Sequence, residues 1–280
     1  LAYGACCSRL STPAVGWYAT ASDLCTMLGG GLSIVRAATW CYCSCEENKI
    51  NSLTRNQARA FYDRFGSRQD KQAFYEDPAL VEMIDQARFT EARRVVEFGC
   101  GTGRLAERLL QSHLSEDASY WCCDLSATMR GLAAERLASF DDRVEIEQTT
   151  GDPALPLADA SADRFLSTYV LDLLCRSEID AVLTEADRVL SSDGLLCLVG
   201  ITPGPTQLSG LVMRLWQRIY ASNPSWVGGC RPVNMRRHLP VDRWLVRYWQ
   251  IVVTWGIASE VIVAEKRDAK PVSPSRTSPA

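Results

Sequence analysis

The chain has 280 residues, of which 47% are hydrophobic and 22% are charged, and its formal net charge is −3. We expect a soluble globular protein with one sizeable domain and extensions. The small negative charge argues against general nucleic-acid binding. Apolar runs such as residues 251–258 are too short to cross a bilayer, so no transmembrane helix is expected.

Residues 1–48 differ in composition from the rest of the chain. They contain six of the 12 cysteines, and they lack the basic start and continuous apolar core of a signal peptide. The Cys-x-Cys-x-Cys run at 41–45 invites a metal-binding interpretation, but zinc pairs are usually spaced C-x₂₋₄-C, and the only histidines are His113 and His238. We predict no metal site and interpret residues 1–48 as a poorly ordered extension ahead of a native start near Asn51.

Two helical segments follow this extension. Ala58, Phe61, Tyr62 and Phe65 recur on one face of the first predicted helix. A second helix is predicted over about residues 78–87.

Residues 94–110 have the pattern of a buried strand, a glycine turn and a helix. β-Branched and aromatic residues at 95–98 supply the strand, and apolar residues at helical spacing follow the turn. Between them, Gly99, Gly101 and Gly103 allow positive φ angles and a close approach of the backbone to a ligand. This turn is the strongest functional signal in the chain.

The glycine spacing separates two classes of nucleotide-binding turn. A dinucleotide fingerprint, G-x-G-x-x-G, would need a glycine at position 104, where the chain has Arg104. The chain instead has G-x-G-x-G, with Glu97 two residues ahead of the first glycine. The run 97–103, EFGCGTG, resembles motif I of the class I S-adenosylmethionine-dependent methyltransferases. The resemblance extends over about residues 51–266.

The resemblance implies an α/β fold and a cofactor. The fold is a Rossmann-like, doubly wound, seven-stranded and mostly parallel sheet, with an antiparallel last strand and helices on both faces. In this family the first helix often covers the cofactor, so Tyr62 and Phe65 either belong to a lid or form the core face of a packing helix. S-adenosylmethionine is expected to contact Glu97, Gly99, Cys100, Gly101, Gly103, Asp124, Leu125, Met129, Gly151, Asp152 and Thr168.

The end of the second predicted strand, residues 120–124, supplies an acid where a ribose would bind. Asp124 stands 21 residues past Gly103, and a carboxylate there can accept hydrogen bonds from both ribose hydroxyls. Ser126 is the better N-cap for the predicted helix 127–138. We therefore expect Asp124 to be left for the ligand.

Residues 144–148 and 165–170 are predicted as the third and fourth strands. By the resemblance, Met129 packs on the adenosine and Asp152 meets the adenine amino group. Glu97 is expected to position the glycine turn or the methionine end of the cofactor, rather than to carry a proton.

Candidate catalytic residues follow the fourth strand. Tyr169 and Asp172 are expected near the transferred methyl group, because substrate and methyl group meet beyond this strand in the family. Each has a structural alternative, since Tyr169 can simply pack in the core and Asp172 can simply cap a helix. A carbon or oxygen acceptor would also need a base, and His238 is the third candidate.

Residues 177–201 predict a helix and a fifth strand. Ser177 and Asp180 resemble a capping box, and the apolar residues that follow keep a period of 3.6. The SSDG sequence at 191–194 is predicted to end this helix, and residues 195–201 to form the strand.

The segment 203–242 is the least generic part of the chain, because it contains five arginines and one acid. A predicted helix carries Arg214 and Arg218 beside an apolar stripe that includes Leu211 and Leu215. Such a helix can lie on an anionic membrane or grip an anionic or apolar acceptor. The alternative is that the stripe packs on the sheet while the arginines are solvated.

Residues 244–254 and 259–266 are predicted as closing strands, the second antiparallel by the resemblance. The Pro- and Ser-rich residues 268–280 have almost nothing to bury and are expected to be disordered. We therefore divide the chain into a Cys-rich extension at 1–48, a methyltransferase domain at 49–266 and a tail at 267–280.

The predicted function is S-adenosylmethionine-dependent methyl transfer, by in-line displacement, to a small-molecule, lipid-like or quinone-like acceptor. Two alternatives stay open: a non-catalytic cofactor-binding or regulatory protein, and a nucleotide-dependent oxidoreductase, which Arg104 argues against. Cysteines beyond the extension occur as in a reduced intracellular protein. We expect a cytoplasmic location, with peripheral membrane contact through residues 208–237.

Overall fold

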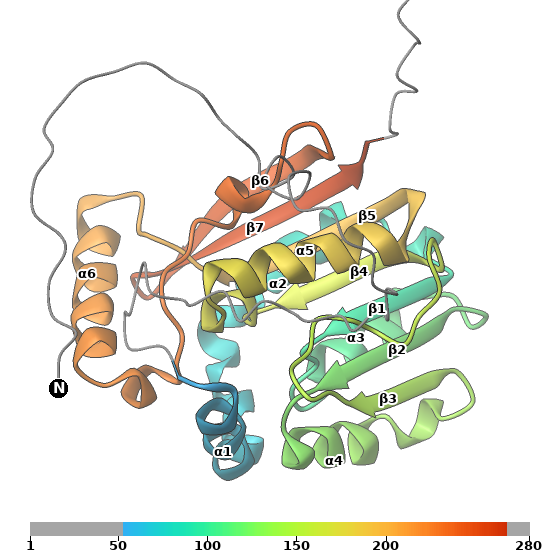
Figure 1. Cartoon of the computed structure of the whole chain (residues 1–280), viewed down its shortest axis with the longest axis horizontal. Coiled ribbons are helices and arrows are strands. Elements are labelled where there is room, and N and C mark those ends of the chain that lie inside the picture. Colours follow the sequence, from blue (N-terminus) through green and yellow to red (C-terminus); the bar gives the residue numbers. More distant parts are fainter. Residues whose placement is uncertain (1–52, 268–280) are drawn as a thin grey trace, which may run out of the picture. The chain divides into compact units, whose positions relative to one another are not determined.

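A seven-stranded sheet organises residues 53–267, which are the residues that the computed structural model describes (Figure 1). The strand order is β3-β2-β1-β4-β5-β7-β6. Neighbouring strands from β3 to β5 are parallel, and β7 pairs antiparallel with both β5 and β6. The strands are β1 (Arg94–Phe98), β2 (Ser119–Asp124), β3 (Val144–Gln148), β4 (Ala162–Thr168), β5 (Leu190–Ile201), β6 (Trp244–Thr254) and β7 (Ile257–Lys266). The predicted fold class is confirmed.

Helices cover both faces of this sheet, as Figure 1 shows, with α5 on one side and α2 and α3 on the other. Val95 of β1 packs with the buried residues of α2 and α3, whereas its neighbour Val96 packs with those of α5. Successive strand side chains point to opposite faces, so one strand supplies both halves of the core. The helices are α1 (Arg55–Phe65), α2 (Ala73–Gln86), α3 (Arg104–Ser112), α4 (Ala127–Arg136), α5 (Arg176–Val189) and α6 (Gln207–Ser222).

Short 3₁₀ segments join several of these elements. They are η2 (Gly66–Gln72), η3 (Phe89–Glu91), η4 (Ala138–Phe140), η5 (Leu171–Leu173), η6 (Pro224–Val227) and η7 (Met235–His238). The predicted helix 127–138 therefore ends at Arg136, and a 3₁₀ turn follows it.

The second helix begins earlier than predicted. We placed its start near Pro78, but α2 begins at Ala73 and continues through the proline. Proline removes one backbone donor, and the bond lost is the one to the carbonyl of Phe74, a residue that is exposed near the helix start. The helix tolerates the proline there because solvent can satisfy that carbonyl.

Strand β4 is shifted toward the N-terminus relative to the predicted 165–170. It begins at Ala162 and ends at Thr168. Tyr169 has a φ of +57°, which is incompatible with an extended strand, so the ladder stops before it.

The start of α5 also differs from the prediction. Cys175, in an extended conformation, is the N-cap residue, and the Glu178 carboxylate accepts a hydrogen bond from the Cys175 amide at 3.1 Å. The pair predicted for this role, Ser177 and Asp180, begins two residues after the N-cap, within the helix itself. At the other end of the helix, the predicted turn at 191–194 is part of β5, opposite an irregular stretch of β4.

Two predicted regions lie outside the described residues, namely the extension at 1–48 and the tail at 268–280. Within residues 53–267, no helix combines the length and apolar content needed to span a membrane. That same part of the chain has no group of three or more His, Cys, Asp or Glu residues placed to hold a metal ion.

Candidate functional site

The glycine turn after β1 adopts a backbone that only glycine accommodates easily. Gly99, Gly101 and Gly103 have φ angles of +86°, +54° and +76°. A Cβ on Gly99 would lie 2.3 Å from Cγ2 of Val170, which is closer than nonbonded atoms approach. The turn therefore needs glycine both for its φ angle and for its contact with the chain after β4.

Asp124, at the end of β2, holds this turn in place. Its Oδ2 accepts a hydrogen bond from the Gly101 amide at 2.9 Å, and its Oδ1 accepts one from the Ser126 amide at 2.8 Å. Burial raises the pKa of this carboxyl, although the two amides oppose that shift. Since a carboxylate offers about four lone-pair positions, about two remain for a ligand. Ser126 caps α4 through Met129, as predicted.

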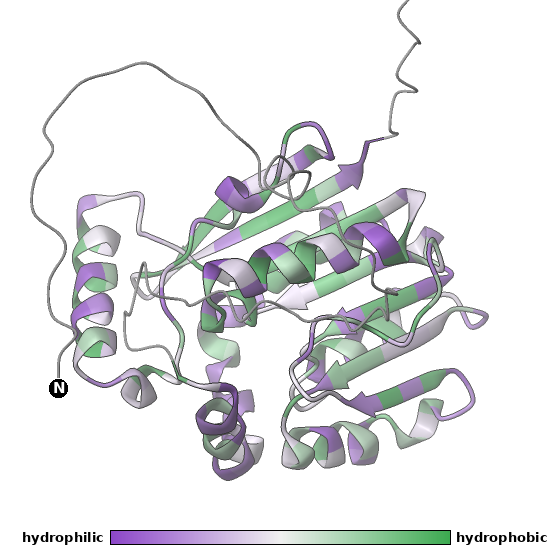
Figure 2. Cartoon of the chain, viewed as in Figure 1, coloured by the Kyte–Doolittle hydropathy of each residue, from purple (hydrophilic) through white to green (hydrophobic). Residues whose placement is uncertain are grey.

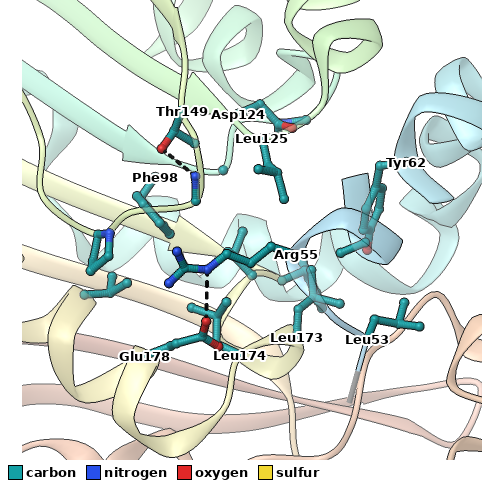
Figure 3. A pocket seen from close by; sticks show the side chains of 18 of the residues that line it. Leu53, Arg55, Tyr62, Phe98, Asp124, Leu125, Thr149, Leu173, Leu174 and Glu178 are labelled. Carbon is teal, nitrogen blue, oxygen red and sulfur yellow. Dashed lines mark hydrogen bonds and ion pairs between the residues drawn. The ribbon is translucent and has the colours of Figure 1, made fainter. Parts of the chain in front are cut away.

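A pocket opens at this edge of the sheet, at the carboxyl ends of β1, β2 and β4 (Figure 3). It contains about 980 Å³ of empty space, which includes open solvent at its mouth. The lining is Leu53, Arg55, Ala58, Tyr62, Gln69, Phe98, Gly99, Gly101, Asp124, Leu125, Thr149, Gly151, Pro153, Thr168, Tyr169, Val170, Leu173, Leu174, Glu178 and Val182.

Helix α1 forms one wall of the pocket and is tied down at both ends. Arg55 Nε lies 3.2 Å from Glu178 Oε1 on α5, and Figure 3 shows this ion pair within the pocket. At the other end, Asp63 accepts a hydrogen bond of 2.5 Å from the Ser126 hydroxyl. The Tyr62 side chain lines the pocket, and its hydroxyl donates to the Gly228 carbonyl at 3.2 Å. The helix thus lies over the pocket as the lid interpretation requires.

A smaller polar cavity adjoins the pocket beside the glycine turn. Its lining is Gln69, Asp70, Glu76, Leu80, Glu97, Gly99, Cys100, Thr102, Arg104, Leu105, Thr168 and Tyr169. Gln69, Gly99, Thr168 and Tyr169 line both spaces, so the two are adjacent. We refer to this space as the polar cavity.

Two buried acids face the polar cavity. Glu97 accepts a hydrogen bond from the Tyr120 hydroxyl at 2.7 Å, and burial raises its pKa to about 7. Glu76 of α2 lies 3.1 Å from Arg104 Nη2; burial raises its pKa to about 7 against the opposing effect of Arg104. In addition, Gln69 Oε1 is buried without a hydrogen-bond partner. These groups can accept hydrogen bonds from a cationic ligand and stabilise its charge.

Tyr169 lies at the junction of the pocket and the polar cavity. Its hydroxyl is 2.9 Å from Ser259 Oγ, and its ring packs edge-on against Tyr75. Burial raises the pKa of the phenol. A non-glycine residue in the left-handed region is uncommon and clusters at functional sites. The predicted role of Tyr169 near the reacting atoms remains a prediction, and its position is compatible with that role.

The other two catalytic candidates are not among the described residues that line the pocket. Asp172 is fully buried; its Oδ2 accepts a hydrogen bond from the Ile201 amide at 3.1 Å, Oδ1 has no partner, and burial raises its pKa to about 7. His238 Nδ1 lies 2.9 Å from Asp180 Oδ1. Asp180 is on the side of α5 opposite to the lining residues Glu178 and Val182. Neither side chain is part of the pocket lining, although Asp172 interacts electrostatically with the lining residues Tyr62 and Tyr169. The catalytic roles of Asp172 and His238 therefore remain predictions.

The predicted cofactor residues divide into three groups. Gly99, Gly101, Asp124, Leu125, Gly151 and Thr168 line the pocket. Glu97 and Cys100 line the polar cavity. Gly103, Met129 and Asp152 are not part of either lining; the Asp152 carboxylate accepts a hydrogen bond from the Ala154 amide within its own turn.

Several lining residues were not predicted. Arg55 and Glu178 are 123 positions apart and carry no local signal of pairing. Thr149 and Pro153 flank the predicted Gly151, and Phe98 and Val170 are the last residues of two predicted strands, so a search of one or two residues around each motif would have found them.

Sequence comparisons support the interpretation of the glycine turn. Residues 95–194 match a family model described as a methyltransferase domain. A malonyl-[acyl-carrier protein] O-methyltransferase of Geobacter sulfurreducens is 29% identical over 145 residues, which are 51% of this chain and 52% of that protein. The enzyme of the same name from Erwinia pyrifoliae is 27% identical over 207 residues, 73% of this chain and 68% of that protein. The match thus spans about half the length of the Geobacter protein.

Solved structures share the fold. The [4+2]-cyclase SpnF superposes with a TM-score of 0.59 at 15% identity, over 77% of this chain and 98% of that one. A geranyl diphosphate methyltransferase in complex with S-adenosylmethionine superposes with a TM-score of 0.53 at 14% identity, over 68% of this chain and 85% of that one. The matched domain, the relatives and the fold agree in supporting the predicted resemblance to the class I S-adenosylmethionine-dependent methyltransferases.

Proposed function

We propose that this chain transfers a methyl group from S-adenosylmethionine to a small-molecule or lipid-like acceptor by in-line displacement. The observation that carries the proposal is Asp124, a half-buried carboxylate that fixes the glycine turn and still has acceptor capacity toward the pocket. The proposal includes residues 49–266 as the methyltransferase domain, 1–48 as an extension and 267–280 as a tail.

The residues present fit S-adenosylmethionine. Asp124 is the residue to bind the ribose, and Leu125, Gly151 and Pro153 offer a largely apolar space for the adenine. The unpaired Gln69 Oε1 and the acids of the polar cavity suit the ammonium at the methionine end. When bound, this cofactor supplies a methyl group that its sulfonium has already activated.

The protein's own contribution is then to bind and align the acceptor. Holding two reactants in reactive geometry lowers the barrier by up to about 7–11 kcal/mol in the best intramolecular reactions. The pocket has an apolar wall formed by Leu53, Leu173, Leu174 and Val182. This wall favours an acceptor with an apolar body. Tyr169 and Val170, at the end of β4, delimit the space beside the glycine turn.

No lining residue of the described pocket is a free base. Asp124 binds two amides, Glu178 pairs with Arg55, and the Tyr169 hydroxyl is hydrogen-bonded to Ser259. This favours an acceptor atom that needs no deprotonation. The two malonyl O-methyltransferases among the relatives are consistent with this preference, because a malonyl group carries a carboxylate, which is already ionised near neutral pH. We infer that Asp172 and His238 do not act as the base.

The finer parts of the proposal concern the surroundings of the reaction. A lipid-like or quinone-like acceptor and a peripheral membrane contact through residues 208–237 are both compatible with the apolar pocket wall. Five of the described cysteines, Cys100, Cys122, Cys123, Cys197 and Cys230, are free thiols, which supports a reducing, cytoplasmic location.

A second candidate function is cofactor binding without methyl transfer, in a regulatory role. The observation in its favour is again that no described lining residue of the pocket is a free base, since a site without a base cannot activate a protonated carbon or oxygen acceptor. The two functions differ in their products. Only a methyltransferase forms a methylated acceptor together with an equal amount of demethylated cofactor.

The test is incubation with S-adenosylmethionine carrying a labelled methyl group and a panel of acceptors: a malonyl thioester, a fatty acid, a quinol and a small amine. We expect label in at least one acceptor, with His238→Gln and Asp172→Asn retaining most of the rate and Asp124→Asn losing it. Label in no acceptor, despite cofactor binding, would favour the second candidate. Loss of the rate in His238→Gln, with the variant folded, would contradict the inference that no base is needed.

A further inference from the structure

Helix α6 exposes a continuous apolar stripe. Leu208, Leu211 and Leu215 retain 71%, 61% and 57% of their accessible surface. The spacing of three and four residues places them on one face of the helix. The opposite side of α6 buries Met213 and Tyr220. Figure 1 shows α6 at the edge of the molecule, and Figure 2 shows hydrophobic residues along it. Single exposed apolar residues are normal on a protein surface, but a contiguous row of large ones marks an interaction site.

Two exposed tryptophans stand on elements that adjoin α6. Trp226 of η6, which follows α6 directly, is 73% exposed, and Trp255 in the turn between β6 and β7 is 82% exposed. That turn lies against α6, because a Cβ on Gly256 would be 2.9 Å from Cγ2 of Val212. We call Leu208, Leu211, Leu215, Trp226 and Trp255 the α6 surface.

Trp255 occupies an unusual position for an aromatic residue. The φ angles of Trp255 and Gly256 are +54° and +82°. A hairpin turn with two positive φ angles strongly prefers Asn-Gly or Asp-Gly. A bulky residue in the left-handed region costs about 1–3 kcal/mol and persists where surrounding structure or function requires it. Because the Trp255 ring is almost fully exposed, packing within this chain does not explain the choice.

The segment that contains α6 is rich in arginine. Residues 202–241 contain five arginines and no Asp or Glu, although the whole chain has a net charge of −3. Arg214 and Arg218 are exposed on α6 itself, on one flank of the leucine row. Two positive charges thus flank the exposed leucines.

We propose that the α6 surface binds anionic phospholipid membranes. Arginines attract anionic headgroups, each contributing about 1 kcal/mol near the surface. Leucines on a helix that lies in the interface enter the boundary between headgroups and acyl chains, and tryptophans favour this same boundary. The side chains of this surface project outward from a helix and a turn. Such a shape suits insertion between lipids, whereas binding of a protein segment would call for a groove.

The α6 surface is also linked to the wall of the pocket. Trp216 Nε1 of α6 donates to the Cys230 carbonyl at 2.8 Å, and Tyr62 of α1 donates to the nearby Gly228 carbonyl. If the proposed methyl transfer holds, a lipid-like acceptor reaches the pocket along this side. Membrane binding itself does not depend on the reaction, so it can be tested without an acceptor.

The experiment is co-sedimentation of the full chain with vesicles of phosphatidylcholine alone and with about one third phosphatidylserine. We expect binding to the anionic vesicles and at least tenfold weaker binding to the neutral ones. The triple variant Leu208→Ser/Leu211→Ser/Leu215→Ser and the double variant Arg214→Gln/Arg218→Gln are each expected to reduce the partition coefficient by about tenfold or more. Because these side chains are exposed, the variants should keep the wild-type melting temperature.

The matched control is Val241→Ser. Val241 is 80% exposed but precedes β6, at the end of that strand opposite to Trp255, so its substitution should leave vesicle binding unchanged. Quenching of tryptophan fluorescence by brominated lipids should fall in Trp226→Phe/Trp255→Phe.

Two results would overturn the proposal. One is wild-type protein that stays in the supernatant with anionic vesicles. The other is vesicle binding that the triple leucine variant leaves intact. If the chain instead forms dimers in light scattering, and the triple variant dissociates them without any vesicle binding by the wild type, the surface is an interface with a second copy.

Discussion

Helices α5 and α6 follow consecutive strands of the sheet, and each begins at a capped residue, but their apolar faces have opposite environments. In α5, Ile179 and Ala186 are fully buried against the sheet. In α6, Leu208, Leu211 and Leu215 are exposed, and only a few residues on the other side are buried. The apolar period is similar in both helices, so the period alone does not decide whether a face is core.

The difference reflects how each helix is connected. Helix α5 returns the chain from β4 to the adjacent parallel strand β5, so it must cross the sheet and cover it. Helix α6 lies between β5 and the closing hairpin β6–β7, outside any parallel crossover. The sheet half therefore carries stability and the pocket, whereas the leucine face of α6 is left exposed.

The largest expected effect is in the sheet half, at the glycine turn. Gly99→Val combines an unfavourable φ angle with a Cβ 2.3 Å from Val170. We expect a loss of stability on the order of 3 kcal/mol and a loss of cofactor affinity of more than about 100-fold. Urea unfolding measures the loss of stability, and calorimetric titration measures the loss of cofactor affinity.

The control for this variant is Gly131→Ala, in α4, where an added Cβ meets nothing within 4 Å. Alanine is expected to raise the free energy of unfolding by about 0.5–1 kcal/mol and to leave cofactor affinity unchanged. Wild-type affinity in Gly99→Val would show that the turn does not contact the ligand.

Truncation of one leucine-sized side chain in each helix tests the comparison directly. Ile179→Ala removes a fully buried side chain from α5 and should cost about 2–4 kcal/mol. Leu211→Ala removes an exposed one from α6 and should change the free energy of unfolding by no more than about 0.5 kcal/mol. Equal losses in urea unfolding would mean that the α6 face is covered within the folded chain.

Glu97 should make stability fall as pH rises. Burial raises its pKa to about 7 in the folded protein, whereas the ordinary value is 4.5. Below pH 4.5 the Glu97 carboxyl is protonated in both the folded and the unfolded protein. Between pH 4.5 and about 7 it is protonated only in the folded protein. The free energy of unfolding therefore decreases by about 3 kcal/mol as pH rises through this window.

Glu97→Gln keeps an acceptor for the Tyr120 hydroxyl and removes the titration. Urea unfolding at pH 5 and pH 7.5 should show a smaller pH-dependent loss in this variant than in the wild type. An identical loss in both would exclude Glu97 as its source and direct attention to Glu76, whose pKa is raised in the same direction.

The smallest effect is expected at the lid. Arg55→Gln removes the ion pair with Glu178 that closes α1 over the pocket. Both partners are partly exposed, so stability should change by less than about 1 kcal/mol, while the cofactor should dissociate a few-fold faster. Arg59→Gln is the control, since Arg59 pairs with Asp63 within α1 at 3.9 Å. Equal changes in stopped-flow dissociation would remove the lid role of Arg55.

The fold could be predicted from the sequence because its signals are local. Strands of β-branched and aromatic residues alternate with helices of period 3.6, and this alternation implies a parallel sheet. The glycine turn and Asp124 were found for the same reason, since the ends of neighbouring parallel strands meet at one edge of the sheet. Errors occurred where backbone conformation departs from the pattern, as at Tyr169, whose positive φ ends β4 early.

The rest of the site depends on contacts between distant segments. The Arg55–Glu178 pair, the burial of Glu76 and the separation of His238 from the pocket follow from how helices dock on the sheet. A local pattern does not specify that docking. Met129 and Leu125 illustrate the same limit, because both are near Asp124 and only Leu125 lines the pocket.

The most direct test of the central claim is calorimetric titration of S-adenosylmethionine and its demethylated product into the protein, with Asp124→Asn and Asp152→Asn alongside. Asp124 ends β2 and Asp152 lies in the turn after β3, but only Asp124 lines the pocket. We predict wild-type binding, a loss of about 30-fold or more in Asp124→Asn, since hydrogen bonds to a charged group contribute about 1.5–3 kcal/mol, and a change of less than about twofold in Asp152→Asn. No binding by the folded wild type, or equal losses in the two variants, would contradict the account.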